Sequence, residues 1–169
     1  MMSEIRNKVT ESSLITIDLE EYYPEGKRVV FDIKDWLFEE LILKEKDFRA
    51  YVKSHDWSQY KNSYVALTCS ADAIIPSWAY LLITSNLSRY SPLVVVGDLI
   101  QLETSIFQNV ISNLPIEQFT GKPVIIKGCS NKPIPDSAYT LLMSRLTHVA
   151  RSIMFGEACS TVPLFKAKK

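Results

Sequence analysis

The sequence predicts an α/β fold in which helices pack on a mainly parallel sheet. Three observations lead to this prediction: short apolar runs recur along the chain, helix-length segments separate them, and a strand–Cys-Ser–helix unit is repeated. Apolar strands that alternate with helices are typical of parallel sheets, because helices cover both faces of such a sheet and each connection crosses over in a right-handed sense. An N-terminal extension of two strands and a helix precedes the repeated part.

Residues 1–60 contain this extension. Apolar and polar residues alternate over residues 14–19, which indicates a half-exposed strand. A second strand is predicted at residues 28–33, after a turn at "PEGK". From residue 33 to about residue 55 apolar residues recur at helical spacing, with a break expected near Lys44.

Residues 61–169 are predicted to form the repeated βα core. The predicted strands are "SYVALT", "PLVVVG", "KPVIIKG" and "SIMFGE", followed by an extended "TVPLFK". The predicted helices are "PSWAYLLITSNL", "QLETSIFQNVISNL" and "PDSAYTLLMSRLTHVA". No long linker or low-complexity segment interrupts the chain, so residues 1–169 are expected to form a single domain.

The three cysteines share one local pattern, since each is followed by serine. Cys69 and Cys129 each stand between an apolar strand and a helix that begins with proline. The two helices align at an offset of 59 residues, with Pro76 matching Pro135. Cys159 follows the last predicted strand and forms a partial third copy. The repeat indicates that the Cys-Ser loop has a function of its own.

Topology suggests where these loops lie. In an open parallel sheet, the loops at the carboxyl ends of the strands line the ligand crevice. Cys69, Asp98 and Cys129 follow three successive predicted strands, and Cys159 follows a fourth. The helix after such a loop presents a partially positive N-terminus, which favours thiolates and anions. We therefore expect the three cysteines to converge on one site, with Asp98 as a fourth member.

One interpretation of this site is a metal centre. Thiolates are the preferred ligands of zinc and of iron–sulfur clusters. Ligation by Cys69, Cys129 and Cys159 would leave one position for Asp98 or for a substrate. The expected cofactor is an iron–sulfur cluster, or a zinc or iron ion. The chain contains no Cys-x-x-Cys pair, so this hypothesis rests on the repeat and on the expected geometry.

Two other kinds of chemistry fit the same loops. A cysteine at a helix N-terminus could carry out thiol redox chemistry or carry a persulfide, and neither needs a histidine partner. Alternatively, Ser70, Ser130 and Ser160 could bind a small anion together with backbone N–H groups, and the cysteines would then be inert. The residue pattern leaves these alternatives open, and it leaves open whether the protein is an enzyme.

Composition argues against several functional classes. Lys and Arg total 19, as do Asp and Glu, and no basic stripe indicates nucleic-acid binding. The longest apolar run, residues 92–97, is too short to cross a membrane, and the N-terminus lacks a signal-peptide core. A cytoplasmic location is expected, where thiols stay reduced. The sequence also allows a homodimer.

Five stretches of the chain resemble the bacterial family called domain of unknown function 2480. They are "FDIKDWLFEELILKEKDFR", "YVALTCSADAIIPSWAY", "GDLIQLE", "KGCSNKPIPDSAY" and "GEACSTVPLF". The resemblance covers residues 14–166 and implies a small cytoplasmic α/β protein. Through the gene neighbourhood of the family it also implies a link to iron–sulfur assembly, whose proteins are the expected partners. A persulfide or scaffold role fits this link equally well.

Overall fold

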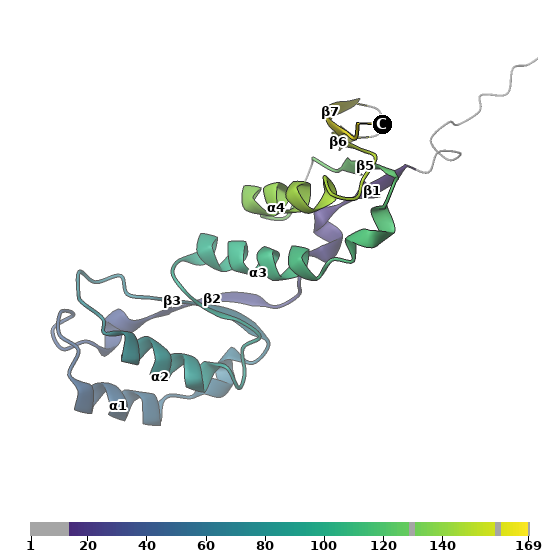
Figure 1. The fold of residues 1–169 in the computed structure, drawn as a ribbon. Helices are drawn as coiled ribbons and strands as arrows, with labels where there is room; N and C mark the ends of the chain where they lie inside the picture. Colours follow the sequence, from purple (N-terminus) through teal and green to yellow (C-terminus); the bar gives the residue numbers. More distant parts are fainter. Residues whose placement is uncertain (1–13, 129–130, 158–159, 169) are drawn as a thin grey trace, which may run out of the picture. The chain divides into compact units, whose positions relative to one another are not determined.

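The computed structural model describes residues 14–128, 131–157 and 160–168. The strands are β1 (Ile15–Ile17), β2 (Lys27–Asp32), β3 (Ser63–Thr68), β4 (Val94–Val96), β5 (Pro123–Ile126), β6 (Ser152–Glu157) and β7 (Ser160–Lys166). The α-helices are α1 (Glu45–Ser54), α2 (Ser77–Leu87), α3 (Leu99–Asn113) and α4 (Asp136–Leu146) (Figure 1). The short 3₁₀-helices are η1 (Leu19–Tyr22), η2 (Ile33–Trp36), η3 (Trp57–Tyr60) and η4 (Ile116–Phe119). The predicted α/β class, with mostly parallel strand pairing, is confirmed.

Contacts within the chain define two compact units. Unit 1 comprises Met1–Tyr23 and Phe107–Lys169, and unit 2 comprises Pro24–Ile106. Unit 2 is thus inserted in the chain between the first strand of unit 1 and the rest of that unit. The boundary falls within α3, whose two parts belong to different units. The single domain expected for residues 1–169 stays a prediction.

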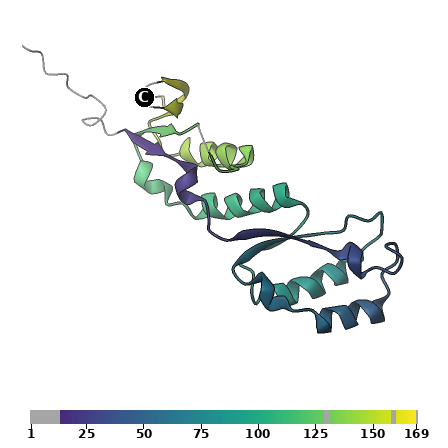
Figure 2. The same ribbon diagram turned by 180° about the vertical axis from the view of Figure 1, so that it is seen from behind.

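Unit 2 is built on the sheet β2-β3-β4, in which all strands are parallel. Because side chains alternate along a strand, Val65 and Leu67 of β3 face one side of the sheet and Ala66 faces the other. Helices α1 and α2 cover the first side, and the first part of α3 covers the second through Leu102 and Ile106 (Figures 1 and 2). The central strand β3 is therefore almost wholly buried.

Unit 1 is built on the sheet β1-β5-β6-β7. The first three strands are parallel, and β7 folds back antiparallel to β6. Helix α4 buries Ala138, Leu142 and Leu146, spaced four residues apart, against the sheet. The second part of α3 adds Phe107 and Ile111 to the same core. Each sheet thus has its own hydrophobic core.

The two units share one internal plan. Helix α2 begins at Ser77 and α4 begins at Asp136, 59 residues later, and η3 and η4 are separated by the same interval. At the same interval, Phe48 of α1 corresponds to Phe107 of α3, and both side chains are fully buried. The repeat is therefore longer than the Cys-Ser–helix unit visible in the sequence, because it begins with a helix before the second strand of each sheet.

Strand pairing follows the same plan. Val65 on β3 pairs with Val94 on β4, and Val124 on β5 pairs with Ile153 on β6. Each residue of the second pair therefore lies 59 positions after its counterpart in the first pair. The first strands β1 and β2 also occupy equivalent places, since each pairs in parallel with the second strand of its unit. The two N-terminal strands thus belong to different sheets.

The turn before the second strand is also repeated. The backbone N–H of Asn62 donates to the carbonyl of Tyr90, and that of Gly121 donates to the carbonyl of Val149. Asn62 and Gly121 have positive φ angles of 59° and 69°. Asparagine and glycine are the residues that adopt this left-handed conformation most readily, so different sequences support the same turn.

The segment between β2 and α1 differs from the predicted long helix. Residues 33–36 form η2, and a tight turn follows, in which Phe38 and Ile42 pair across Glu39 and Glu40. Both glutamates have positive φ angles, which end any helical run. The break expected near Lys44 is confirmed, because Lys44 is the residue that precedes the first turn of α1.

Truncation of a repeated core phenylalanine should destabilise the protein strongly. Phe48 is fully buried, and Phe48→Ala removes a ring that neighbouring side chains cannot replace, so we expect the free energy of unfolding to fall by about 3–5 kcal/mol. Leu81 on α2 is 68% exposed, and Leu81→Ala should change the free energy of unfolding by less than about 0.5 kcal/mol. Urea unfolding of both variants is the measurement, and equal losses would contradict the assigned core.

Candidate functional site at the carboxyl ends of the strands

Cys69 follows β3 and lies at the carboxyl end of that strand. Its side chain is half-buried and packs against the core of unit 2. The thiol donates a weak hydrogen bond to the carbonyl of Ala71, with sulfur and oxygen 3.7 Å apart. Tyr80 of α2 lies close by: burial raises the pKa of its hydroxyl, and the charge of a Cys69 thiolate raises it further. The thiol therefore packs against the apolar core of unit 2 and lies near Tyr80.

Asp32 is the last residue of β2 and holds the loop that contains Cys69. Its Oδ1 atom accepts a hydrogen bond from the backbone N–H of Lys34 at 3.0 Å, which caps η2. The same oxygen accepts the backbone N–H of Ser70 at 3.0 Å, across 38 residues of sequence.

The environment of Asp32 favours its ionised form. Burial by itself raises the pKa of the carboxyl, but hydrogen bonds from Ser70 and from the backbone of Lys34 lower it. The net result is a pKa below its ordinary value. Asp32 is thus a carboxylate at neutral pH.

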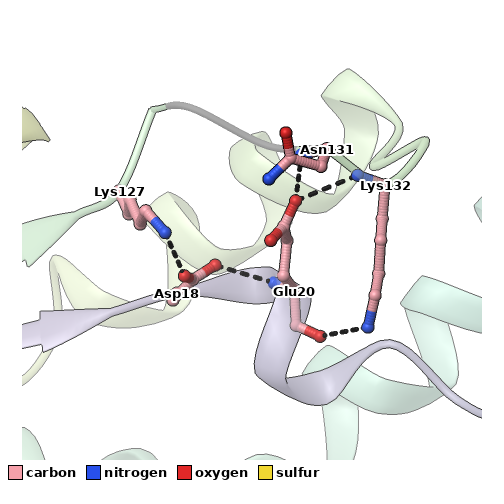
Figure 3. A network of polar contacts seen from close by, with 5 residues as sticks. All are labelled: Asp18, Glu20, Lys127, Asn131 and Lys132. Atoms are coloured by element: carbon pink, nitrogen blue, oxygen red, sulfur yellow. Dashed lines mark hydrogen bonds and ion pairs between the residues drawn. The ribbon is translucent and has the colours of Figure 1, made fainter.

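In unit 1, carboxylates at the corresponding strand end bind residues that precede and follow Cys129 and Ser130 in the sequence (Figure 3). Asp18 follows β1 and caps η1 by accepting the N–H of Glu20 at 2.9 Å. Its other oxygen is 2.6 Å from Nζ of Lys127, the residue after β5. The backbone N–H groups of Asn131 and Lys132 donate to Oε1 of Glu20, and Nζ of Lys132 donates to the Glu20 carbonyl.

The ion pair between Asp18 and Lys127 shifts the pKa values of both side chains. Burial raises the pKa of Asp18, but hydrogen bonds from Lys127 and from the backbone of Glu20, together with the positive charges of Lys127 and Lys132, lower it below its ordinary value. The hydrogen bond to Asp18 raises the pKa of Lys127. Thr68 stands in unit 2 at the position that Lys127 has in unit 1, so Asp32 has no equivalent cation on that strand.

Asp98 has a structural role at the carboxyl end of β4. Its Oδ1 atom accepts the backbone N–H of Gln101 at 2.8 Å, and the Gln101 side chain accepts the N–H of Asp98 at 2.9 Å. This reciprocal pair is a capping box that starts α3. The preceding Gly97 has a φ of 147°, and the corresponding positions in unit 1 are Gly156, with a φ of 122°, and Glu157.

The structure tests only part of the predicted convergence. Cys69 and Asp98 follow neighbouring strands of one sheet, β3 and β4. Cys129, Ser130 and Cys159 lie outside the described residues. Ser70 and Ser160 are exposed, the latter as the first residue of β7. Within the described ranges no group of three His, Cys, Asp or Glu side chains is arranged to hold a metal ion. The shared site stays a prediction.

Sequence reasoning missed the contacts that Asp32, Asp18 and Glu20 make with residues that follow the second strand of each unit. A signal was present, because Asp18, directly after β1, and Asp32, the last residue of β2, are each followed by a large aliphatic residue, Leu19 or Ile33. Both aliphatic side chains are buried, so the chain enters its 3₁₀-helix in the same way in each unit. The partner loops lie far away in sequence, and no local pattern indicates them.

The comparisons with known proteins identify a family. A family model described as "Protein of unknown function (DUF2480)" matches residues 3–167, nearly the whole chain. No curated protein and no solved structure matches the chain. In the part of the chain that the structure describes, no helix has both the length and the apolar character needed to cross a membrane.

Acid should weaken the contribution of Asp32 to stability. The folded-state pKa of Asp32 lies below its unfolded value of about 3.9, so this contribution is present above about pH 4 and is lost as pH falls through the lowered folded pKa. We expect the difference in free energy of unfolding between wild type and Asp32→Asn to shrink over this range. Urea titrations at pH 7 and at pH 3 measure it. A difference that grows in acid would contradict the assignment.

Proposed function

The chain belongs to the DUF2480 family, and we propose that it binds a transition-metal ion or an iron–sulfur cluster through the cysteines of its Cys-Ser loops. One observation carries the proposal: the backbone N–H groups of Ser70 in unit 2 and of Asn131 and Lys132 in unit 1 already donate to carboxylates of the protein itself. These amides are therefore already bound within the protein, and the half-exposed Cys69 thiol is the group beside them that can take a ligand, which suits a soft cation.

The same observation argues against the alternative of a small-anion site. An anion would need the N–H groups of Ser70 and Lys132, but Asp32 and Glu20 accept them. A cation needs no N–H donors, and a soft cation would select the thiolate.

The proposed ligands are Cys69, Cys129 and Cys159, with Asp98 as a fourth candidate. Cys69 is half-exposed, so its sulfur can exchange the weak hydrogen bond to Ala71 for a metal bond. Asp98 uses Oδ1 for its capping box, and a carboxylate can ligate through its second oxygen. Thiolates must form for the metal to bind, so affinity should fall at low pH.

A second candidate function is that of a persulfide carrier. The half-exposed thiol of Cys69 beside the Tyr80 hydroxyl supports it, since a thiolate can attack the outer sulfur of a donor persulfide while the donor leaves as a thiolate. Both functions fit a cytoplasmic protein whose partners are iron–sulfur assembly proteins, and this is the cellular role that we propose.

Metal content distinguishes these functions. After anaerobic purification, elemental analysis should find iron or zinc in the wild type, and iron–sulfur binding should add visible absorption. Each of Cys69→Ser, Cys129→Ser and Cys159→Ser should lower the metal content, with affinity falling on the order of tenfold or more. The control Ser70→Ala keeps the thiols and should retain the metal.

Two outcomes would contradict metal binding. One is metal at trace level in the wild type together with three freely titratable thiols. The other is metal content that all three cysteine variants retain. Cyanolysis of the same samples measures sulfane sulfur, and sulfur that Cys69→Ser abolishes would establish the persulfide carrier instead.

A further inference from the structure

We propose that Asp32 is a positioning residue that fixes the Cys69-Ser70 loop and thereby controls access to the Cys69 thiol. The inference concerns the loop that the proposed function uses, but it holds for the free thiol and depends on no metal. In this proposal the carboxylate of Asp32, at the end of β2, controls the thiol of Cys69, which follows the neighbouring strand β3.

The pairing of β2 with β3 brings the two groups together. The parallel register ends with Asp32 opposite Thr68, so the loop that begins at Cys69 starts beside the Asp32 carboxylate. Oδ1 accepts two backbone N–H groups, one from its own η2 and one from Ser70, each at 3.0 Å. A single oxygen atom therefore accepts hydrogen bonds from the start of η2 and from the start of the Cys69 loop.

The thiol lies between two anchored points. On one side Cys69 is bonded to Ser70, whose N–H is held by Asp32. On the other side its own sulfur reaches the carbonyl of Ala71 and packs on the core that includes Tyr80. Loss of the Asp32 acceptor would free the Ser70 amide and let the loop move away from the core. The half-buried thiol would then become more exposed.

Unit 1 contains an equivalent arrangement that is formed by different residues. Asp18 occupies the place of Asp32 and contacts Lys127 at the start of the loop after β5. Glu20, two residues later, binds the N–H groups of Asn131 and Lys132 further along that loop (Figure 3). In both units a carboxylate after the first strand therefore holds the loop after the second strand.

Capping alone does not explain this arrangement. Asp56 caps η3 as Asp32 caps η2, by accepting the backbone N–H two residues ahead at 3.0 Å. It also accepts the hydroxyl of Ser58 and so acts only on neighbouring residues. Asp56 is thus a matched control, a 3₁₀-helix cap that takes no part in holding the Cys69 loop.

The test is the alkylation rate of Cys69 in the full-length protein. Chelator-treated wild type, Asp32→Ala, Asp32→Asn and Asp56→Ala react with iodoacetamide between pH 7 and 9, and mass spectrometry of peptides follows Cys69 alone. Asp32→Ala should react about tenfold faster at every pH, the scale expected when a hydrogen bond to a charged group is lost. Asp56→Ala should keep the wild-type rate, although it loses a cap.

Asp32→Asn separates position from charge. Its amide oxygen can still accept an N–H but carries no charge, so it should react within about twofold of wild type, with an unshifted pH profile. Equal acceleration in Asp32→Asn and Asp32→Ala would overturn the proposal in favour of an electrostatic effect. An unchanged rate in Asp32→Ala would also overturn it. If Asp32→Ala does not fold, amide exchange decides: the Ser70 N–H must stay protected in Asp32→Asn, and its loss there refutes the positioning role.

Discussion

Parallel pairing between the first and second strands of each unit is the constraint on which the candidate site depends. β2 with β3, and β1 with β5, run in the same direction, so the residues after both strands meet at one edge of the sheet. This places Asp32 beside the loop of Cys69 in unit 2, and Asp18 beside Lys127, the residue that follows β5, in unit 1. An antiparallel pairing would put the aspartate at the opposite end from the cysteine.

The site also shows how one backbone plan can support two electrostatic environments. In unit 1 the aspartate after the first strand is paired with Lys127, and Glu20 takes over the loop amides. In unit 2 Thr68 replaces the lysine, and Asp32 itself holds the loop amide. The residues that follow the second strand therefore have different charged neighbours in the two units, although the strands around them pair in the same register.

Local features of the fold were predictable from the sequence, and non-local ones were not. The apolar run at β3 and the proline that precedes α2 are local signals, and both elements are where they were expected. The turn at Phe38–Ile42 was missed because its spacing imitates a helix, while the positive φ of Glu39 and Glu40 has no sequence signature. The division of strands between two sheets depends on pairing, which the order of elements does not determine.

The same distinction applies to the site. The repeated Cys-Ser pairs are visible in the sequence, whereas the bond from Ser70 to Asp32 joins residues 38 positions apart and leaves no periodic trace. Asp98 was expected as a metal ligand from its place after a strand, and the capping box with Gln101 explains that place in structural terms. Both interpretations use the same fact, the exposed carboxyl end of β4.

The nested order of the two units has a consequence for synthesis of the chain on the ribosome. Unit 2 is continuous in sequence, so its strands emerge in turn and can pair as soon as β4 is made. β1 is translated first, yet its partner β5 follows more than a hundred residues later, a delay on the order of ten seconds at ordinary elongation rates. Throughout that interval Ile15 and Ile17 have no native strand to pair with. β1 therefore waits for its native partner longer during synthesis than β2 or β3 does.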